Sequence, residues 1–131
     1  MGLGDMLIQM GLTYGSKDAV DFCHDIGFAM ADTAIAASAD LARERGAFEK
    51  CHIDEIMSTP YFKANTTDAT AEKVKEYGLR NSQLLTIAPT GTLSTMLGIS
   101  GGIEPIYANF YERKTESFTG QTCTIKSIRQ S

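Results

Sequence analysis

A short run of small, polar residues has the composition of an anion-binding turn. It begins at Pro89 and reads Pro-Thr-Gly-Thr-Leu-Ser. The residues before it, Leu84–Ala88, form an apolar run as long as a buried strand, and helical spacing resumes after it. A turn that opens a helix leaves backbone N–H groups without partners at the positive end of the helix dipole, which suits a phosphate. The candidate phosphate ligands are the amides, and the hydroxyls where present, of Thr90, Gly91, Thr92, Leu93 and Ser94.

The same turn also has a purely structural interpretation. Threonine and serine are ordinary N-caps, and many proteins place a capped helix after a strand and a proline without binding a ligand. The turn contains no lysine and no Gly-Lys-Ser/Thr, so it is not a Walker loop. On the local pattern alone the structural interpretation is favoured, and the phosphate hypothesis needs support from the rest of the chain.

A serine within a glycine-rich loop could act as a nucleophile. Gly98-Ile-Ser-Gly-Gly102 matches the Gly-x-Ser-x-Gly of a hydrolase, which needs a histidine after its serine. Both histidines, His24 and His52, precede Ser100, and a helix instead of a strand is expected before the loop. We therefore reject a hydrolase function unless a partner chain supplies the histidine base. The glycines are interpreted as residues that let the loop turn sharply.

Potential metal ligands cluster at Cys51, His52 and Glu55. Structural zinc sites usually combine two such clusters from distant parts of a chain, and this sequence has no second one. We therefore expect no bound metal, and interpret His52 as an exposed residue at the start of a helix. The other histidine, His24, is expected on a solvated helix face.

The longest expected element is a helix over residues 17–45, which begins after Ser16 and ends before Gly46. Apolar residues at three- and four-residue steps predict one buried stripe along it: Ala19, Phe22, Ile26, Met30, Thr33, Ala37 and Leu41. Shorter helices are expected over residues 3–10, 52–58 and 69–77, with a polar loop over 61–68. Strands are expected over residues 84–88, 106–111 and 122–128.

Composition places the chain among globular proteins. Of its 131 residues, 43% are hydrophobic and 21% charged, which suffices for one domain with a core. A net charge of −4 without basic runs argues against a nucleic-acid partner. No apolar run approaches the ~20 residues of a membrane span. The three widely spaced cysteines indicate reduced thiols in the cytoplasm.

Residues 80–116 resemble the large catalytic subunit of ribonucleotide reductase. The specific similarity lies in Thr-Ile-Ala-Pro-Thr-Gly-Thr at residues 86–92 and in Gly-Ile-Glu-Pro at residues 102–105. Supporting similarity occurs in the same order at the start of the chain and over Ala36–Gly46, and the resemblance extends to about Gly120. It implies that the Pro89–Ser94 turn holds substrate phosphates, and that Pro89 and Glu104 lie near the active site.

The resemblance also implies a fold and an activity. The expected fold class is α+β, mostly helical, as an excerpt of the family's ten-stranded α/β barrel. A single fragment, residues 1–131, would be helical over 1–78 and supply a strand–turn–helix and short strands over 79–131. The parent enzyme would reduce ribonucleoside di- or triphosphates by thiyl-radical chemistry, which makes deoxyribonucleotides for DNA synthesis.

The family's radical cysteine lies within Asn-x-Cys-x-Glu, and none of Cys23, Cys51 and Cys123 has those neighbours. The isolated chain is therefore expected to be inactive and to need the rest of the reductase chain, or to associate with copies of itself. The sequences of residues 91–94 and 100–105 look most like those of the adenosylcobalamin-dependent class of the family. The residues that bind this cofactor would lie outside this chain. The alternative is a small helical binding or assembly module without catalytic activity.

Overall fold

The computed structural model describes residues 1–105, 108, 110–116 and 122–128, the last two ranges by their backbone only. The chain divides into two compact units. The helical unit comprises Lys17–Thr86, and the turn unit comprises Met1–Ser16 with Ile87–Ser131.

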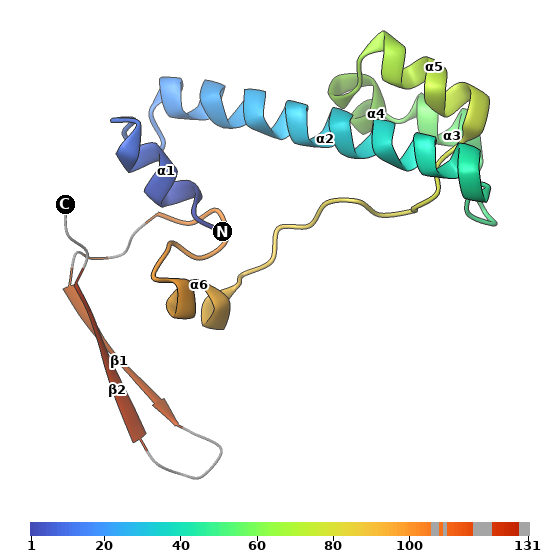
Figure 1. The fold of residues 1–131 in the computed structure, drawn as a ribbon. Helices are drawn as coiled ribbons and strands as arrows, with labels where there is room; N and C mark the ends of the chain where they lie inside the picture. The colour runs from blue at the N-terminus through green and yellow to red at the C-terminus, as the bar shows by residue number, and fades with distance from the viewer. Residues whose placement is uncertain (106–107, 109, 117–121, 129–131) are drawn as a thin grey trace. The chain divides into compact units, whose positions relative to one another are not determined.

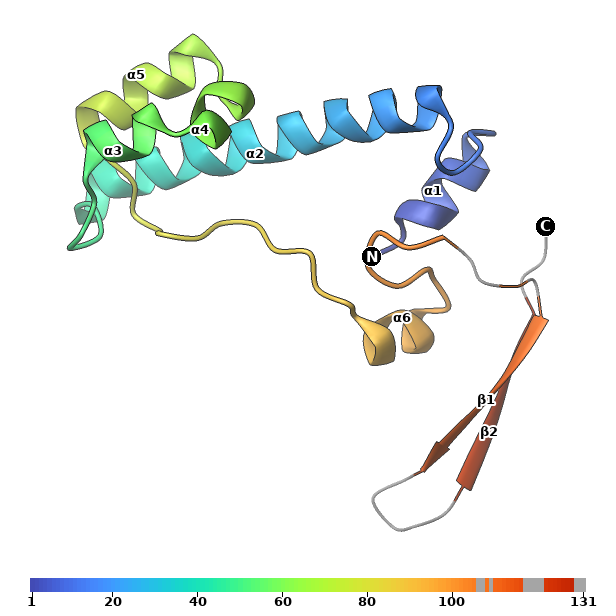
Figure 2. The same cartoon turned by 180° about the vertical axis from the view of Figure 1, so that it is seen from behind.

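Four helices build the helical unit: α2 (Lys17–Arg45), α3 (Ile53–Ser58), α4 (Pro60–Asn65) and α5 (Asp68–Tyr77). The three shorter helices gather around the C-terminal half of α2, with α5 packed along it (Figures 1 and 2). The core lies where these helices meet, and its buried residues are Ile35, Ala39, Phe62, Val74 and Leu79.

A hydrogen bond and an ion pair connect α5 to α2 beside this core. The carboxylate of Asp32 on α2 accepts the backbone N–H of Thr67, the N-cap of α5, at 2.8 Å. Farther along, the ammonium of Lys73 lies 2.9 Å from a carboxylate oxygen of Asp40. The lysine pair is half-exposed, so its contribution to stability is small, whereas the Asp32 contact satisfies a helix-end donor.

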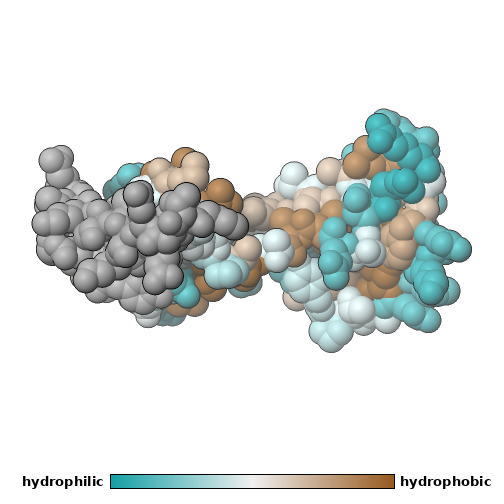
Figure 3. Space-filling view, turned by 90° about the horizontal axis from the view of Figure 1, so that it is seen from below, coloured by the Kyte–Doolittle hydropathy of each residue, from teal (hydrophilic) through white to brown (hydrophobic). Residues whose placement is uncertain are grey.

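The buried face of α2 is not the stripe expected from the sequence. Of that stripe only Ala19 is buried, whereas Met30 is 54% and Leu41 38% exposed. In the C-terminal half the neighbouring helices cover a different, small-residue face: Ala31, Ile35, Ser38, Ala39 and Ala42. The helix is apolar on more than one side, so periodicity alone could not decide which side packs. Hydrophobic surface consequently remains on the helical unit (Figure 3).

The segment expected to be a polar loop after residue 60 is helical instead. Pro60 occupies the first turn of α4, where a missing N–H removes no hydrogen bond. The side chain of Thr59 caps this helix by accepting the N–H of Phe62 at 3.2 Å. Burial of Phe62, only 4% exposed, explains why so short a helix forms. The helix expected over residues 69–77 is confirmed as α5, with a threonine cap and a terminal glycine.

The turn unit contains α1 (Leu3–Gln9), α6 (Gly91–Leu97), β1 (Phe110–Glu116) and β2 (Thr122–Ile128). The two strands pair antiparallel, with Phe110 opposite Ile128 and Glu116 opposite Thr122 (Figure 1). The strand expected over residues 122–128 is confirmed. Of the strand expected over residues 106–111, residues 106, 107 and 109 lie outside the described residues.

The expected fold class, an α+β excerpt of a ten-stranded α/β barrel, is wrong. The described residues form helices and one antiparallel hairpin, without a parallel strand pair or a barrel. The strand expected over Leu84–Ala88 is absent, and these residues are not part of any sheet. A strand exists only by pairing with a neighbour, and no described segment lies alongside this one to form a ladder.

Candidate anion-binding site

The candidate phosphate turn, Pro89–Ser94, opens α6 in the turn unit. Thr90 is the N-cap residue and has φ 47° and ψ 30°, the only described residue other than glycine with a positive φ. A β-branched residue rarely adopts this left-handed conformation, which stores strain on the order of 1–3 kcal/mol. Gly91 follows in open space, since a Cβ built there meets no atom within 4 Å.

The backbone amides of this turn fall into two groups. The N–H of Ser94 donates to the carbonyl of Thr90 at 2.8 Å and is therefore engaged within the helix. The N–H groups of Gly91, Thr92 and Leu93 donate to no residue in the part of the chain that the structure describes. All three residues are exposed, so these amides can reach an anion from solvent.

The hydroxyls of the turn also differ in their partners. The oxygen of Thr90 accepts the N–H of Gly102 at 2.9 Å, which leaves the hydroxyl proton for another acceptor. Ser94 is buried, and its hydroxyl donates to the carbonyl of Gly91 at 3.2 Å. Thr92 is exposed. Thr90 and Thr92 can therefore offer hydroxyls to a ligand, whereas Ser94 stiffens the turn.

A second segment, here called the glycine loop (residues 98–104), packs against the phosphate turn. A Cβ at Gly101 would lie 3.2 Å from the carbonyl oxygen of Pro89 and 3.2 Å from the hydroxyl of Ser94. Gly102 has φ 53°, and its Cβ would lie 3.3 Å from the carbonyl oxygen of Ala88. The two segments that carry the family resemblance are thus in contact, and glycine permits that contact.

Glu104 and Pro89, expected near the active site, belong to these two segments. Both are exposed, and the N–H of Glu104 donates to the carbonyl of Gly101 at 3.1 Å. The glutamate therefore closes the glycine loop by a turn, and this loop in turn contacts the residues around Pro89.

Ser100, the serine of the hydrolase pattern, is a structural residue. It is 5% exposed, its N–H donates to the carboxylate of Asp5, and its hydroxyl oxygen accepts the N–H of Asp5 at 3.3 Å. A nucleophilic serine needs an accessible oxygen and a histidine base, and Ser100 has neither among its described partners. Sequence analysis missed Asp5, because its partner lies 95 residues away in the chain.

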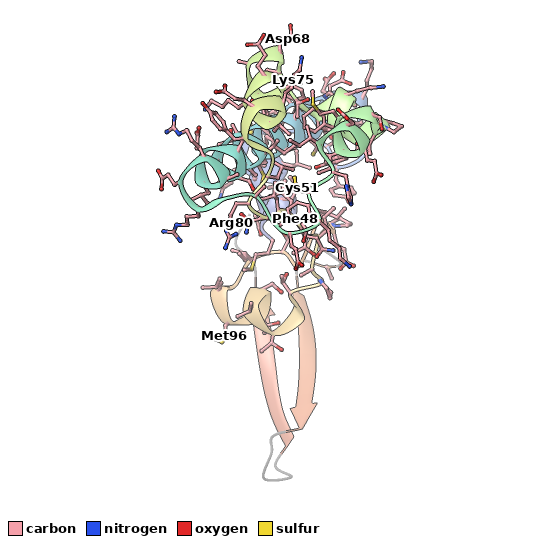
Figure 4. The ribbon with its side chains drawn as sticks, turned by 90° about the vertical axis from the view of Figure 1, so that its right-hand side faces the viewer. Phe48, Cys51, Asp68, Lys75, Arg80 and Met96 are labelled. Atoms are coloured by element: carbon pink, nitrogen blue, oxygen red, sulfur yellow. The ribbon has the colours of Figure 1, made fainter. Side chains whose placement is uncertain are left out.

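The cysteine of the candidate metal cluster has a structural partner. The sulfur of Cys51 accepts the N–H of Leu79 at 3.3 Å and packs against the core beside Phe48 (Figure 4). Within the described ranges, no three His, Cys, Asp or Glu side chains lie close enough to hold a metal ion. His24 is exposed, with its Nδ1 3.7 Å from a carboxylate oxygen of Asp25.

The helical unit has a groove of about 480 Å³ that the sequence did not predict. Its walls come from α2, α3, α4 and the extended segment 81–86, and they are mainly apolar. No His, Cys, Asp or Glu lines it. Among the described residues, no helix combines the length and apolar character needed to cross a membrane.

Comparison with known proteins identifies relatives over most of the chain. A family profile described as the ribonucleotide reductase barrel domain matches residues 1–129. The chain is 30% identical, over 99% of its length, to a ribonucleoside-diphosphate reductase subunit alpha from Chlamydia pneumoniae. It is 35% identical, over 86% of its length, to a vitamin B12-dependent ribonucleoside-diphosphate reductase from Thermoplasma acidophilum. The chain spans 15% and 13% of the length of these two relatives.

Proposed function

Because the chain belongs to the ribonucleotide reductase family, within its barrel domain, we propose that the phosphate turn binds the phosphates of a ribonucleotide substrate. Family membership confirms the resemblance inferred from residues 80–116. The observation that carries the proposal is the state of the turn: the amides of Gly91, Thr92 and Leu93 have no partner among the described residues. They follow the strained Thr90, whose hydroxyl proton is available to an anion.

Such a turn binds by geometry more than by charge. It contains no lysine or arginine, so the ligand is held by backbone N–H groups and hydroxyls. Holding the phosphates contributes to catalysis by fixing the sugar in place, although no bond changes at the phosphate end. We therefore expect moderate affinity and ready release.

The activity proposed for the parent enzyme is reduction of ribonucleoside diphosphates to deoxyribonucleotides by a thiyl radical. The relatives named above are diphosphate reductases, which supports a diphosphate substrate. None of the three cysteines has the Asn-x-Cys-x-Glu neighbours of the radical cysteine. Of the two whose side chains are described, Cys51 accepts a backbone hydrogen bond, and Cys23 lies half-buried on α2. The radical cysteine is therefore supplied by another part of the reductase, and the 131-residue chain is inactive without it.

Adenosylcobalamin is the cofactor that the resemblance and one named relative suggest for the parent enzyme. The resemblance places the residues that would bind it outside this chain. The groove of the helical unit has no His, Cys, Asp or Glu in its walls, and no cluster of such residues occurs elsewhere in the described ranges. We therefore assign no step to the cofactor in this chain.

Titration with inorganic pyrophosphate and with adenosine diphosphate tests the phosphate turn. We expect the amide NMR signals of Gly91, Thr92 and Leu93 to shift together as either ligand binds. Gly91→Asp should weaken binding by roughly tenfold or more, because the added carboxylate repels the ligand at close range. It should not unfold α6, since a Cβ at this position meets open space and an acidic residue at a helix start is favourable.

Met96→Asp is the matched control for this variant. Met96 lies on the same helix, is 78% exposed and projects away from it (Figure 4), so the substitution adds the same charge outside the turn. It should weaken binding much less than Gly91→Asp does, because its charge lies in water, roughly 7 Å farther along the helix axis than the turn. Equal affinities of wild type and Gly91→Asp would contradict the proposal.

A second candidate function is assembly through α2. The face formed by Ala29, Met30, Thr33, Ala34 and Ala37 is apolar, shallow and open. It offers small side chains against which a second copy could pack closely. If the chain self-associates here, Met30→Glu should shift sedimentation toward monomer, whereas Ala69→Glu on the exposed start of α5 should not. A monomeric wild type would eliminate this alternative.

A further inference from the structure

Ser100 and the first turn of α1 are joined through the backbone and side-chain polar atoms of the serine. The N–H of Ser100 donates to the Asp5 carboxylate, and the hydroxyl oxygen of Ser100 accepts the N–H of Asp5. The carbonyl of Ser100 accepts the N–H of Gly2 at 2.8 Å. Because Ser100 is buried, water does not compete strongly for these bonds. The glycine loop is therefore fixed to α1 at this residue.

The same turn of α1 touches the other end of the glycine loop. A Cβ at Gly4 would lie 2.9 Å from the carbonyl oxygen of Glu104 and 3.2 Å from the hydroxyl of Ser100. The first of these distances is too short for any real Cβ, so only glycine allows α1 to approach the loop this closely. Because the glycine loop contacts α1 at both Ser100 and Glu104, it has little freedom to shift along this helix.

The glycine loop carries this constraint to the phosphate turn. Ile99 donates its N–H to the carbonyl of Ser94 at 3.0 Å, and Gly102 donates its N–H to the hydroxyl oxygen of Thr90 at 2.9 Å. Gly101, between Ser100 and Gly102, lies against the carbonyl of Pro89. Asp5 is thus linked to Thr90 through one serine and one backbone amide.

We propose that Asp5 is a positioning residue for the phosphate turn and acts through Ser100 and Gly102 on Thr90. The Asp5 carboxylate sets the position of the glycine loop, so that the Gly102 N–H meets the Thr90 oxygen. That bond holds Thr90 in its left-handed conformation and presents its hydroxyl proton to the ligand. This inference rests on the proposed function, since it takes the bound anion to be the substrate phosphate.

The test measures two quantities separately in the 131-residue chain: the stability of the Gly102–Thr90 hydrogen bond and the affinity for pyrophosphate. Amide hydrogen exchange at Gly102 reports the bond to Thr90 without any ligand, and titration with inorganic pyrophosphate reports the site. Asp5→Ala should speed exchange at Gly102 by roughly tenfold and weaken pyrophosphate binding several-fold, because a hydrogen bond to a charged acceptor is lost. Asp5→Asn should recover much of both, since its side-chain carbonyl can still accept from Ser100.

Asp18→Ala is the matched control, since Asp18 is an exposed acidic residue in the first turn of α2. It should change neither readout. A merely structural role for Asp5 would speed exchange throughout α6, whereas positioning changes Gly102 while the amides later in α6 remain protected. If Asp5→Ala unfolds α6, the same comparison is made with Asp5→Asn.

Three outcomes decide the matter. Faster exchange at Gly102 together with weaker pyrophosphate binding supports the inference. Unchanged exchange at Gly102 in both Asp5 variants overturns it, whatever happens to the ligand. If wild type binds no pyrophosphate, the proposed function fails and the positioning role fails with it, while the exchange data still show whether Asp5 holds the glycine loop.

Discussion

The carboxylate of Asp32 accepts two hydrogen bonds from Thr67, one from its backbone N–H at 2.8 Å and one from its hydroxyl at 3.1 Å. The Thr67 oxygen in turn accepts the N–H of Thr70 at 3.3 Å. A residue of α2 therefore holds the capping residue of α5. The backbone bond from Thr67 is the main reason that the pKa of Asp32 lies below its ordinary value of 3.8, and partial burial opposes this only in part.

Asp32→Ala should destabilise the helical unit by about 1 kcal/mol, which is typical for the loss of a helix-capping interaction. Urea unfolding followed by circular dichroism measures this difference. Asp25→Ala is the control, because Asp25 lies on the same helix with its side chain 85% exposed. Equal midpoints for the Asp32 and Asp25 variants would show that the Thr67 contact contributes nothing.

The contribution of Asp32 should depend on pH in a defined direction. Folding lowers the pKa of this carboxyl, so the folded state favours the charged form. Its stabilisation is therefore complete above the ordinary aspartate pKa and is lost as the pH falls through the lower, folded-state pKa. Wild type and Asp32→Ala should differ most in stability above the ordinary aspartate pKa, and the two should converge as the pH falls through the lowered, folded-state pKa of Asp32. A difference that grew on acidification would contradict this sign.

Phe62→Ala should destabilise the helical unit by about 3–5 kcal/mol, the usual effect of emptying a core phenylalanine site. Phe62 is 4% exposed and contributes most of what the short α4 buries. Its neighbour Tyr61 is 58% exposed, so Tyr61→Ala should change stability by less than about 1 kcal/mol. Similar losses from both variants would mean that α4 does not pack through Phe62.

Two helical glycines should respond oppositely to alanine. Gly27 on α2 has no atom near its missing Cβ, so Gly27→Ala should stabilise the chain by about 0.5–1 kcal/mol through helix propensity. Gly4→Ala should destabilise it by about 1–3 kcal/mol, because the new Cβ collides with the backbone carbonyl of Glu104. Thermal unfolding of both variants tests this contrast. Stabilisation by Gly4→Ala would show that α1 does not contact the glycine loop so closely.

Substitutions at Thr90 should separate backbone strain from ligand binding. Thr90→Gly removes the strained conformation but also the acceptor for the Gly102 N–H, and these effects of about 1–3 kcal/mol each oppose one another. Its stability should therefore stay within about 1 kcal/mol of wild type, while pyrophosphate binding weakens. Thr90→Ser keeps the hydroxyl and should bind as wild type does. Equal binding by the two variants would remove the hydroxyl from the site.

Local signals in the sequence identified three of the four helices of the helical unit, α2, α3 and α5, and missed α4. Thr67 before α5, and the glycine after it, have the residue types that start and end a helix, and both helix ends occur where expected. Pro60 fits the end of the helix expected over residues 52–58 as well as the start of α4, and the buried Phe62 two residues later stabilises the helix that begins there. Burial is decided by the folded chain, so the local pattern could not distinguish the two.

The sequence predicted which residues form the candidate site, but it did not predict the backbone conformation that they adopt. The small residues from Pro89 to Ser94 indicated a turn before a helix, and α6 begins there. The left-handed Thr90 could not be foreseen, because threonine disfavours that conformation unless its surroundings impose it. The sequence favoured a sharp glycine loop over a nucleophile at Ser100, but it could not indicate the partner Asp5, which only folding brings to this serine.

The extended backbone of residues 82–88 makes no hydrogen bond within the part of the chain that the structure describes, and its side chains are exposed. Proteases bind their substrates as extended chains, so this stretch has the conformation that a cleavage site requires. The boundary between the two compact units falls within it, between Thr86 and Ile87. A nick at that point would break no contact inside either unit, and the fragments 1–86 and 87–131 would stay associated through the hydrogen bonds of Ser100 to Gly2 and Asp5.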